Sequence, residues 1–412
     1  MGLRQESRSA FVALTALLAA ASLSVGGVVA QQSSYPHATE PIGTVRQMYD
    51  GALTPELAVN TFRNIDRLFP TRLVAHGTRV KQLPLADQPL GAVKFASGGR
   101  EYDLEQYLEA NRVAGILVLK DGRIALERYR YGNTERTRWM SMSVAKALTS
   151  TLIGAAIKQG RLELSDTVTR FVPALAGSAY EGVTVRDVLM MSSGVRWDET
   201  YTDSSSDRRH LLEAQISQTP GSAMKVMRSL PRGGPVGTIN TYSTGETQVA
   251  AEVLRGAIKR PLSDYLSDLI WSRYGMEADA NWWLESQDGI EIGGSGFSAT
   301  LRDYGRFGQF ILDGGVAAGE AIVPDGWIQD ATTPKTLIGG RPLMYGYFWW
   351  PGTTVAARQD NAYEGRGIFG QHLYINPATH VVIVVWGALT RPSGGAGVSD
   401  WAFFDAVAET LR

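Results

Sequence analysis

The chain has no cysteine among its 412 residues. The lack of thiols excludes a disulfide framework, a thiolate zinc site, an iron–sulfur cluster and a cysteine nucleophile. The sequence also has no excess of either charge, since 40 Lys and Arg face 41 Asp and Glu, for a formal net charge of −1. Nucleic-acid-binding proteins normally carry a basic excess that offsets phosphate charge, so we expect no nucleic-acid partner.

Histidine is scarce, and the five that occur show no spacing typical of metal ligands. They are His37, His76, His210, His372 and His380. We interpret all five as structural or surface residues, and we predict neither a metal ion nor an organic cofactor. Hydrophobic residues make up 44% of the chain and charged residues 20%, which is the balance of a globular protein with a sizeable core.

The first 30 residues have the pattern of an export signal. Arg4 and Arg8 precede an uncharged run over 10–30, which ends in small residues before a polar break. This pattern predicts a secretory signal peptide cleaved after Ala30, and therefore a periplasmic or secreted protein. An uncleaved membrane anchor is the alternative, because the run is just long enough to span a bilayer. No later segment approaches about 18 uninterrupted apolar residues, so we expect no stable membrane insertion once the signal is removed.

The mature chain divides into a linker and N-terminal extension, 31–104, and a main domain, 105–412. Residues 31–45 are polar and turn-rich, and we expect 46–104 to be irregular because Pro70, Pro84 and Pro89 interrupt its apolar stretches. The main domain opens with a hairpin, in which a strand over 116–119 turns at Asp121-Gly122 and returns over 124–131.

A mostly helical stretch, 160–310, separates the hairpin from further strands. Thr184 to Asp187 and Thr300 to Asp303 have the spacing of helix capping boxes within it. Strands are predicted over 345–350, 373–375 and 381–386, and a final helix over 401–411. The fold class is therefore α/β of the α+β kind, an antiparallel sheet built from both ends of the domain, flanked by helices and carrying an inserted helical subdomain, 160–310.

The segment Ser143-Val144-Ala145-Lys146 is the strongest candidate for catalysis. It opens an apolar helix that we predict from Ser143 to Lys158, closed by Gly160. Residues i and i+3 of a helix are neighbours on one face, so the amine can lie beside the hydroxyl. Burial would disfavour the charged ammonium and let Lys146 act as a base toward a serine nucleophile.

A second pair has the same spacing, Ser222 and Lys225. It lies in a loop-rich stretch between Pro220-Gly221 and Leu230-Pro231, whereas Ser143 follows a predicted strand pair and begins a helix. The context favours Ser143 as the nucleophile.

Several ordered segments resemble the serine hydrolases of the β-lactamase and penicillin-binding superfamily. The likeness covers about 105–412 and is strongest in the class C-related branch, with esterases, D-amino-acid peptidases and 6-aminohexanoate-oligomer hydrolases. Its segments are Ser143-Val-Ala-Lys146, 160–166, 185–194 and 293–303. The resemblance implies a β-lactamase-like fold and an acyl-enzyme on Ser143, with Lys146 as base.

The second and third motifs of that superfamily depart from the usual residues. Tyr-x-Asn falls on Tyr242-Ser243-Thr244, where Tyr242 is expected to hold its proton poorly and serve as a base or proton relay. Lys-Thr-Gly falls on Gly365-Arg366-Gly367, without its lysine. By the resemblance, the backbone N–H groups of Ser143 and Ile368 would form the oxyanion hole.

Substrate contacts are predicted at Arg366 and Gly367, and in the loop Trp197–Asp203. That loop interleaves Trp197 and Tyr201 with three acids, a composition that suits the wall of a cleft for an amine or sugar-like group. A solvated turn pinned by one tryptophan is the alternative for the loop, and a solvated loop residue is the alternative for Arg366.

We therefore expect a serine hydrolase that cleaves an amide or ester bond of a small molecule. Two alternatives remain open, a β-lactamase and a non-catalytic module of the same fold that binds cell-wall peptides. The altered second and third motifs disfavour the β-lactamase. The combined presence of serine, lysine and tyrosine disfavours the pure binding module.

Overall fold

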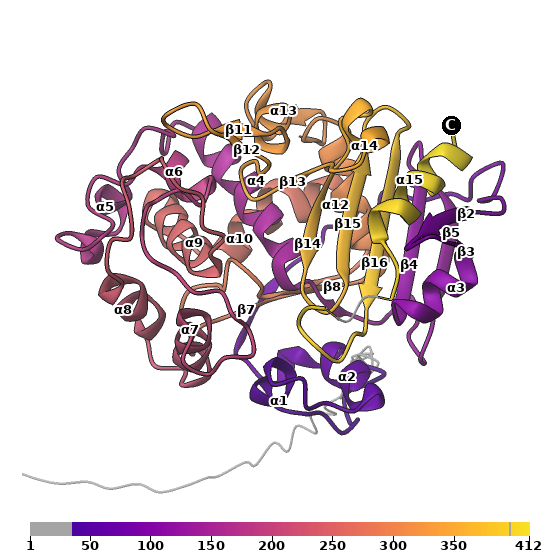
Figure 1. Ribbon diagram of the computed structural model, residues 1–412, viewed down its shortest axis with the longest axis horizontal. Coiled ribbons are helices and arrows are strands. Elements are labelled where there is room, and N and C mark those ends of the chain that lie inside the picture. Colours follow the sequence, from indigo (N-terminus) through magenta and orange to yellow (C-terminus); the bar gives the residue numbers. More distant parts are fainter. Residues whose placement is uncertain (1–34, 395–396) are drawn as a thin grey trace, which may run out of the picture. The chain divides into compact units, whose positions relative to one another are not determined.

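The computed structural model describes residues 35–394 and 397–412, and its centre is a six-stranded antiparallel sheet drawn from both ends of the main domain (Figure 1). In spatial order the strands are β13 (Trp350–Pro351), β14 (Tyr363–Gly367), β15 (Gln371–Asn376), β16 (Val381–Gly387), β4 (Val113–Lys120) and β5 (Arg123–Tyr129). β4 and β5 form the predicted hairpin, and β16 pairs with β4 across the chain. The predicted fold class is confirmed.

Side chains alternate between the two faces of this sheet, and both faces are buried. Leu117 and Leu119 of β4 pack into one apolar cluster, with the helix α12 (Leu301–Leu312). Ile116 and Val118 point the other way, into a second cluster with α15 (Asp400–Thr410) and α3 (Leu104–Ala110). Two buried faces explain why the strand is an unbroken apolar run rather than an alternating one.

The stretch between Gly160 and α12 is mainly helical, as expected. Its helices are α5 (Val168–Phe171), η3 (Pro173–Leu175), α6 (Val185–Leu189), α7 (Asp207–Ile216), α8 (Ser222–Ser229), α9 (Thr244–Ile258), α10 (Leu262–Leu266), η4 (Ser267–Trp271) and α11 (Ser272–Tyr274). Thr184 and Thr300 accept hydrogen bonds from the backbone N–H groups of Asp187 and Asp303, so both predicted N-caps form. Only Thr184 and Asp187 complete the reciprocal capping box, because Asp303 bonds the Thr300 hydroxyl rather than its backbone N–H. The predicted subdomain, 160–310, includes most of α12, but α12 packs on the large sheet. From here on, helical subdomain therefore means α5–α11.

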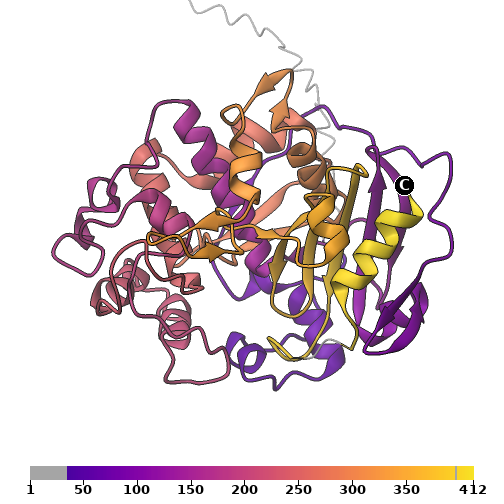
Figure 2. The same ribbon diagram turned by 45° about the horizontal axis from the view of Figure 1, so that its top comes forward.

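The helix α4 (Ala145–Lys158) lies between the helical subdomain and the sheet, and Figures 1 and 2 show this arrangement from two directions. It contacts α9 on one side and β14 on the other. The junction between the two parts of the domain is therefore the place where the predicted nucleophile lies.

A smaller sheet of four strands ties the N-terminal extension to the main domain. Its order is β1 (Thr71–Val74), β7 (Ala280–Trp283), β8 (Phe297–Ala299) and β6 (Trp139–Met140). The extension also contains α1 (Val45–Tyr49), α2 (Pro55–Phe62), η1 (Ile65–Arg67) and the hairpin of β2 (Lys94–Ser97) and β3 (Arg100–Asp103). The expectation that 46–104 is irregular holds for 75–93, which contains Pro84 and Pro89 and no helix or strand. It was wrong for the rest of the segment, where helices and strands form on either side.

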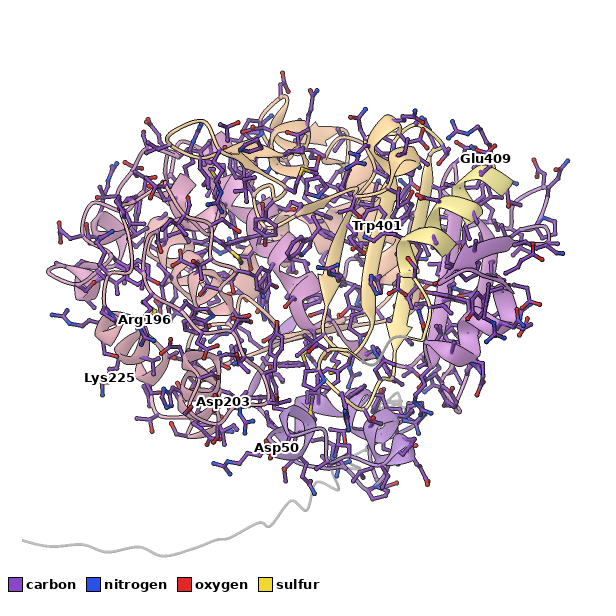
Figure 3. The ribbon with its side chains drawn as sticks, viewed as in Figure 1. Asp50, Arg196, Asp203, Lys225, Trp401 and Glu409 are labelled. Atoms are coloured by element: carbon purple, nitrogen blue, oxygen red, sulfur yellow. The ribbon has the colours of Figure 1, made fainter. Side chains whose placement is uncertain are left out.

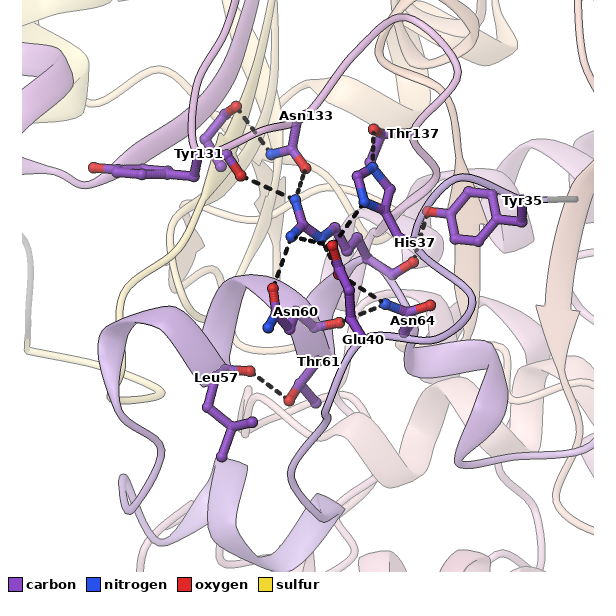
Figure 4. A network of polar contacts seen from close by, with 12 residues as sticks. Tyr35, His37, Glu40, Leu57, Asn60, Thr61, Asn64, Tyr131, Asn133 and Thr137 are labelled. Atoms are coloured by element: carbon purple, nitrogen blue, oxygen red, sulfur yellow. Dashed lines mark hydrogen bonds and ion pairs between the residues drawn. The ribbon is translucent and has the colours of Figure 1, made fainter.

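A buried polar network fastens the start of the described chain to the segment before β6 (Figure 4). Glu40 accepts hydrogen bonds from Arg63 Nε and Nη2, both at 2.7 Å. His37 lies 3.0 Å from Glu40 on one side of its ring and 3.0 Å from Thr137 Oγ1 on the other. Arg63 also donates to the carbonyl of Tyr131 at 2.9 Å. These contacts pack the extension against the chain that leads to Ser143.

The predicted strand over 345–350 is largely absent, since only Trp350 belongs to a strand. Phe348 adopts a positive φ of +65°, which breaks the extended run before β13. The remaining elements near this region are short: β9 (Val316–Ala317), β10 (Glu320–Ala321), α13 (Trp327–Thr332), β11 (Lys335–Thr336), β12 (Pro342–Leu343) and α14 (Val355–Gln359).

The predicted signal peptide, 1–30, lies outside the described residues. Among the residues that are described, no helix combines the length and apolar character needed to cross a membrane.

Candidate active site

Ser143 lies on a strained turn at the entrance to α4. The predicted helix from Ser143 begins instead with the 3₁₀ turn η2 (Met142–Val144), and α4 proper starts at Ala145. Met142, although not a glycine, has φ +43°. Such conformations are held only where the surroundings enforce them, and they recur at functional sites. Here the turn leads into Ser143, which lines a cavity of about 740 Å³.

Lys146 is buried directly beside Ser143. Its Nζ lies 2.9 Å from Ser143 Oγ, 2.9 Å from the carbonyl oxygen of Gly294 and 3.3 Å from Thr244 Oγ1. Only 1% of the lysine is exposed. Burial lowers the pKa of Lys146 to about 7, and this outweighs the opposing effect of the Glu199 carboxylate. A substantial fraction of this amine is therefore unprotonated at neutral pH.

Thr244 and Glu199 complete the surroundings of the amine, and sequence reasoning assigned neither a role. Thr244 is the first residue of α9, and its hydroxyl lies 2.5 Å from Glu199 Oε1. Its backbone N–H donates to Glu199 Oε2 at 2.9 Å. Trp197 Nε1 donates to the same oxygen at 2.5 Å. The acids of the loop Trp197–Asp203 were the one sequence signal for this carboxylate, but the sequence did not show which of them faces the amine.

Tyr242 lies over the same amine, with its ring centroid 5.4 Å from Lys146 Nζ. Its ring packs against Tyr345 and Trp350 at centroid distances of 6.1 and 5.4 Å. Burial and the Glu199 carboxylate raise the pKa of Tyr242 above its ordinary value, against a smaller lowering by the Ser143 side chain. The expectation of a phenol that loses its proton readily is not met. Burial destabilises the phenolate more than the neighbouring groups stabilise it.

The end of β14 packs against the backbone of Ser143. A Cβ atom on Gly367 would lie 2.9 Å from the Ser143 nitrogen and 2.8 Å from the Ser141 carbonyl oxygen. Ile368, the next residue, is half-buried and lines the cavity. The structure thus brings together the two residues whose N–H groups were predicted to form an oxyanion hole.

Arg366, between two glycines of the same strand, also lines the cavity. Its guanidinium carbon lies 4.6 Å from the centroid of the Trp350 ring, and its side chain is 45% exposed. Of the predicted contacts in the loop, Tyr201 lines the cavity together with Glu199. Trp197, the other predicted contact, does not line the cavity: it is 8% exposed and donates a hydrogen bond to Glu199.

His372 was expected to be a structural or surface residue, and it is buried beside the cavity. Its ring lies 2.8 Å from Glu364 and 3.4 Å from Asp400. Burial alone would lower the pKa of His372, but the two carboxylates raise it above the ordinary value. In the described part of the chain, no group of three or more His, Asp and Glu residues is arranged to hold a metal ion.

The competing pair Ser222 and Lys225 does not form a site. Ser222 donates its hydroxyl to the Ala214 carbonyl oxygen at 2.8 Å. Lys225 is exposed on the outer surface of α8, where Figure 3 labels it. The structure therefore supports Ser143 over Ser222, as the sequence context predicted.

Comparison with known proteins agrees with this fold. The Beta-lactamase family profile matches residues 103–405. The 6-aminohexanoate-dimer hydrolase of Paenarthrobacter ureafaciens is 32% identical over 296 residues, which cover 68% of this chain and 74% of the relative. A β-lactamase of Pseudomonas fluorescens is 28% identical over 100 residues, covering 22% of this chain and 28% of that protein.

Solved structures share the fold at lower identity. A Bacillus anthracis protein proposed to be a 6-aminohexanoate-dimer hydrolase superposes with a TM-score of 0.72 and 24% identity, covering 81% of this chain and 89% of its own. EstCE1, a hydrolase with promiscuous acyltransferase activity, superposes with a TM-score of 0.58 and 13% identity, covering 74% of this chain and 96% of its own.

The fold and these relatives define a serine hydrolase of the β-lactamase and penicillin-binding class. Within that class, the chain belongs to the Beta-lactamase family and has a 6-aminohexanoate-dimer hydrolase as a relative at 32% identity.

Proposed function

We propose that the protein hydrolyses amide or ester bonds of small molecules through an acyl-enzyme formed on Ser143. The observation that carries this proposal is the 2.9 Å separation of Lys146 Nζ and Ser143 Oγ at the wall of a cavity. A lysine whose pKa is about 7 can accept the serine proton at neutral pH, as a general base must.

Acylation begins when the neutral amine of Lys146 removes the proton of the Ser143 hydroxyl. The oxygen attacks the substrate carbonyl, and the N–H groups of Ser143 and Ile368 stabilise the negative oxygen that forms. Tyr242, whose raised pKa keeps it protonated, then donates a proton to the leaving amine or alkoxide. Its phenol is the proton donor of the step, and Lys146 is the base. The ammonium of Lys146 then returns the serine proton to the Tyr242 phenolate, so both groups regain their starting protonation before deacylation.

Deacylation follows the same path in reverse, with water in place of the leaving group. Lys146 removes a proton from the water, which attacks the acyl carbonyl under the same two N–H groups, and its ammonium gives that proton to the Ser143 oxygen as the acyl bond breaks. The released acid leaves Ser143 free. No step requires a group that these residues do not supply.

A linear amide is the substrate class we favour over a β-lactam. The relative at 32% identity is named for hydrolysis of a 6-aminohexanoate dimer. This chain has Thr244 at the asparagine position of the second motif, and Gly365 and Arg366 where the third motif has lysine and threonine. Those are the positions at which a β-lactamase of this family would be expected to keep its usual residues.

A substrate panel tests the proposal. We expect turnover of p-nitrophenyl esters and linear amides and little or none of the β-lactam nitrocefin, with all turnover lost in Ser143→Ala. Preferential turnover of nitrocefin would instead indicate a β-lactamase. Saturable binding of cell-wall peptides, with no covalent adduct on any probe, would indicate a binding module.

We further propose that the protein is exported to the periplasm or medium after cleavage behind Ala30. The basic start and apolar run of the sequence support this. N-terminal sequencing of the protein from a native cell envelope should begin at Gln31, and a start at Met1 or Gly2 would contradict cleavage.

A further inference from the structure

We propose that Glu199 is a positioning residue, which acts through the Thr244 hydroxyl to keep the lone pair of Lys146 directed at Ser143. The inference rests on the proposed function, because it concerns the base of that reaction. It adds a residue that neither the motif nor the comparisons assign.

The argument counts donors and acceptors around the amine. A neutral lysine amine has two N–H bonds and one lone pair. The Gly294 carbonyl oxygen, 2.9 Å away, can only accept, so it takes one N–H. If Thr244 Oγ1 takes the second N–H, the lone pair is left for the third neighbour, the Ser143 hydroxyl at 2.9 Å.

A threonine hydroxyl can either donate or accept a hydrogen bond, so Thr244 by itself does not have to accept from Lys146. If its own proton pointed at Lys146, it would occupy the lone pair and disable the base. The carboxylate of Glu199 prevents this, since an ionised carboxylate only accepts and its Oε1 lies 2.5 Å from Thr244 Oγ1. The hydroxyl must therefore donate to Glu199 and accept from Lys146.

Glu199 is itself held so that one oxygen is reserved for this contact. Its Oε2 accepts from Trp197 Nε1 at 2.5 Å and from the Thr244 backbone N–H at 2.9 Å. The Trp197 Nε1–H and the Thr244 backbone N–H can only donate, so the atom at the Oε2 position of residue 199 must be an acceptor. Thr244 is 4% exposed, which leaves its hydroxyl little access to water.

These constraints predict that Glu199→Gln impairs the base more than removal of the Thr244 hydroxyl does. The glutamine oxygen must take the Oε2 place, so its NH₂ group falls opposite Thr244 Oγ1 and donates to it. The threonine proton then turns toward Lys146 and occupies its lone pair. Thr244→Val has no hydroxyl to turn, so it loses one contact to the amine without blocking it.

The readout is the rate at which a fluorophosphonate probe labels the full-length protein at pH 9, where Lys146 is neutral in every variant. We expect about a 100-fold slower rate for Glu199→Gln, within the range of general-base effects. Thr244→Val should be slowed only about 10-fold on the same scale. The double variant should recover to the rate of Thr244→Val, so a second substitution restores activity.

Asp203→Asn is the matched control, because the structure places this exposed acid of the loop outside the cavity lining, where it bonds Ser205 and not the amine (Figure 3). It should label at the wild-type rate, and thermal melting should show all variants folded. A double variant as slow as Glu199→Gln, or a Glu199→Gln rate within threefold of wild type, would overturn the inference.

A purely electrostatic role for Glu199 gives a different result. Removal of its negative charge would then only make Lys146 easier to deprotonate, so labelling at pH 6 would rise while the rate at pH 9 stayed unchanged. Failure of the proposed function itself is recognised separately, because Ser143→Ala would then be labelled like the wild type.

Discussion

Gly367 stands so close to Ser143 that a methyl group on its Cα would lie 2.9 Å from the Ser143 amide nitrogen. The strand β14 can approach the nucleophile this closely only with a glycine at this place. The close approach places the Ser143 amide beside the residue that precedes Ile368, the other predicted oxyanion donor.

Gly367→Ala should therefore lower kcat by about 100-fold or more, because displaced backbone donors no longer meet the oxyanion. Steady-state hydrolysis of a p-nitrophenyl ester measures the loss. Gly365→Ala is the control on the same strand, since its added methyl would meet only ordinary contacts, the nearest at 3.5 Å. Equal losses in both variants would contradict a specific contact between Gly367 and the nucleophile.

The pH dependence should show an acidic limb near 7. The base works only when Lys146 is neutral, so kcat/KM should rise with pH through the pKa of about 7 and then level off. Lys146→Arg should be inactive across the same range, because a guanidinium stays protonated. An acidic limb near 10, the ordinary lysine value, would contradict a buried and neutral amine.

Tyr242→Phe should affect amides far more than activated esters. With its pKa raised, Tyr242 serves as the proton donor to the leaving group, and p-nitrophenolate leaves without a proton. We expect about a 100-fold loss of amide hydrolysis but less than about a tenfold loss with the p-nitrophenyl ester. Equal losses on both substrates would identify Tyr242 as the base for Ser143 instead.

Glu246, a buried carboxyl of α9, should make stability fall between pH 4.5 and 7. Burial raises its pKa to about 7, against hydrogen bonds from Ser193 and Tyr180. A carboxyl whose pKa is raised in the folded state contributes its full stability below its unfolded-state pKa. This stability is lost as the pH rises through its folded-state pKa.

Glu246→Gln removes this titration while its oxygen can still accept from Ser193 and Tyr180. The variant should gain on the order of 2 kcal/mol relative to wild type between pH 4.5 and pH 7.5. Urea denaturation at the two pH values measures this difference. A difference that does not change with pH would show that the native carboxyl titrates normally.

Local patterns in the sequence predicted the parts of the site that are local. Ser143 and Lys146 are one helical turn apart, so their contact follows from spacing alone. The hairpin of β4 and β5 follows from two apolar runs around Asp121-Gly122. Each of these predictions needed fewer than about 20 residues of context.

Contacts that depend on the folded chain could not be predicted in this way. Thr244 meets Glu199 across 45 residues and Lys146 across 98. Nothing in the sequence of 345–350 shows that Phe348 adopts a positive φ, or that its N–H donates to the distant Leu189 carbonyl oxygen. The raised pKa of Tyr242 likewise reflects burial that only the assembled cavity creates.

Peptide mapping of a covalent adduct tests the central claim most directly. The wild-type protein is treated with a fluorophosphonate probe and digested with trypsin, and the peptide from Trp139 to Lys146 is sequenced by mass spectrometry. The account predicts one adduct per chain, located on Ser143, absent from Ser143→Ala and unchanged in Ser222→Ala. An adduct on another residue, or an equally labelled Ser143→Ala, would contradict it.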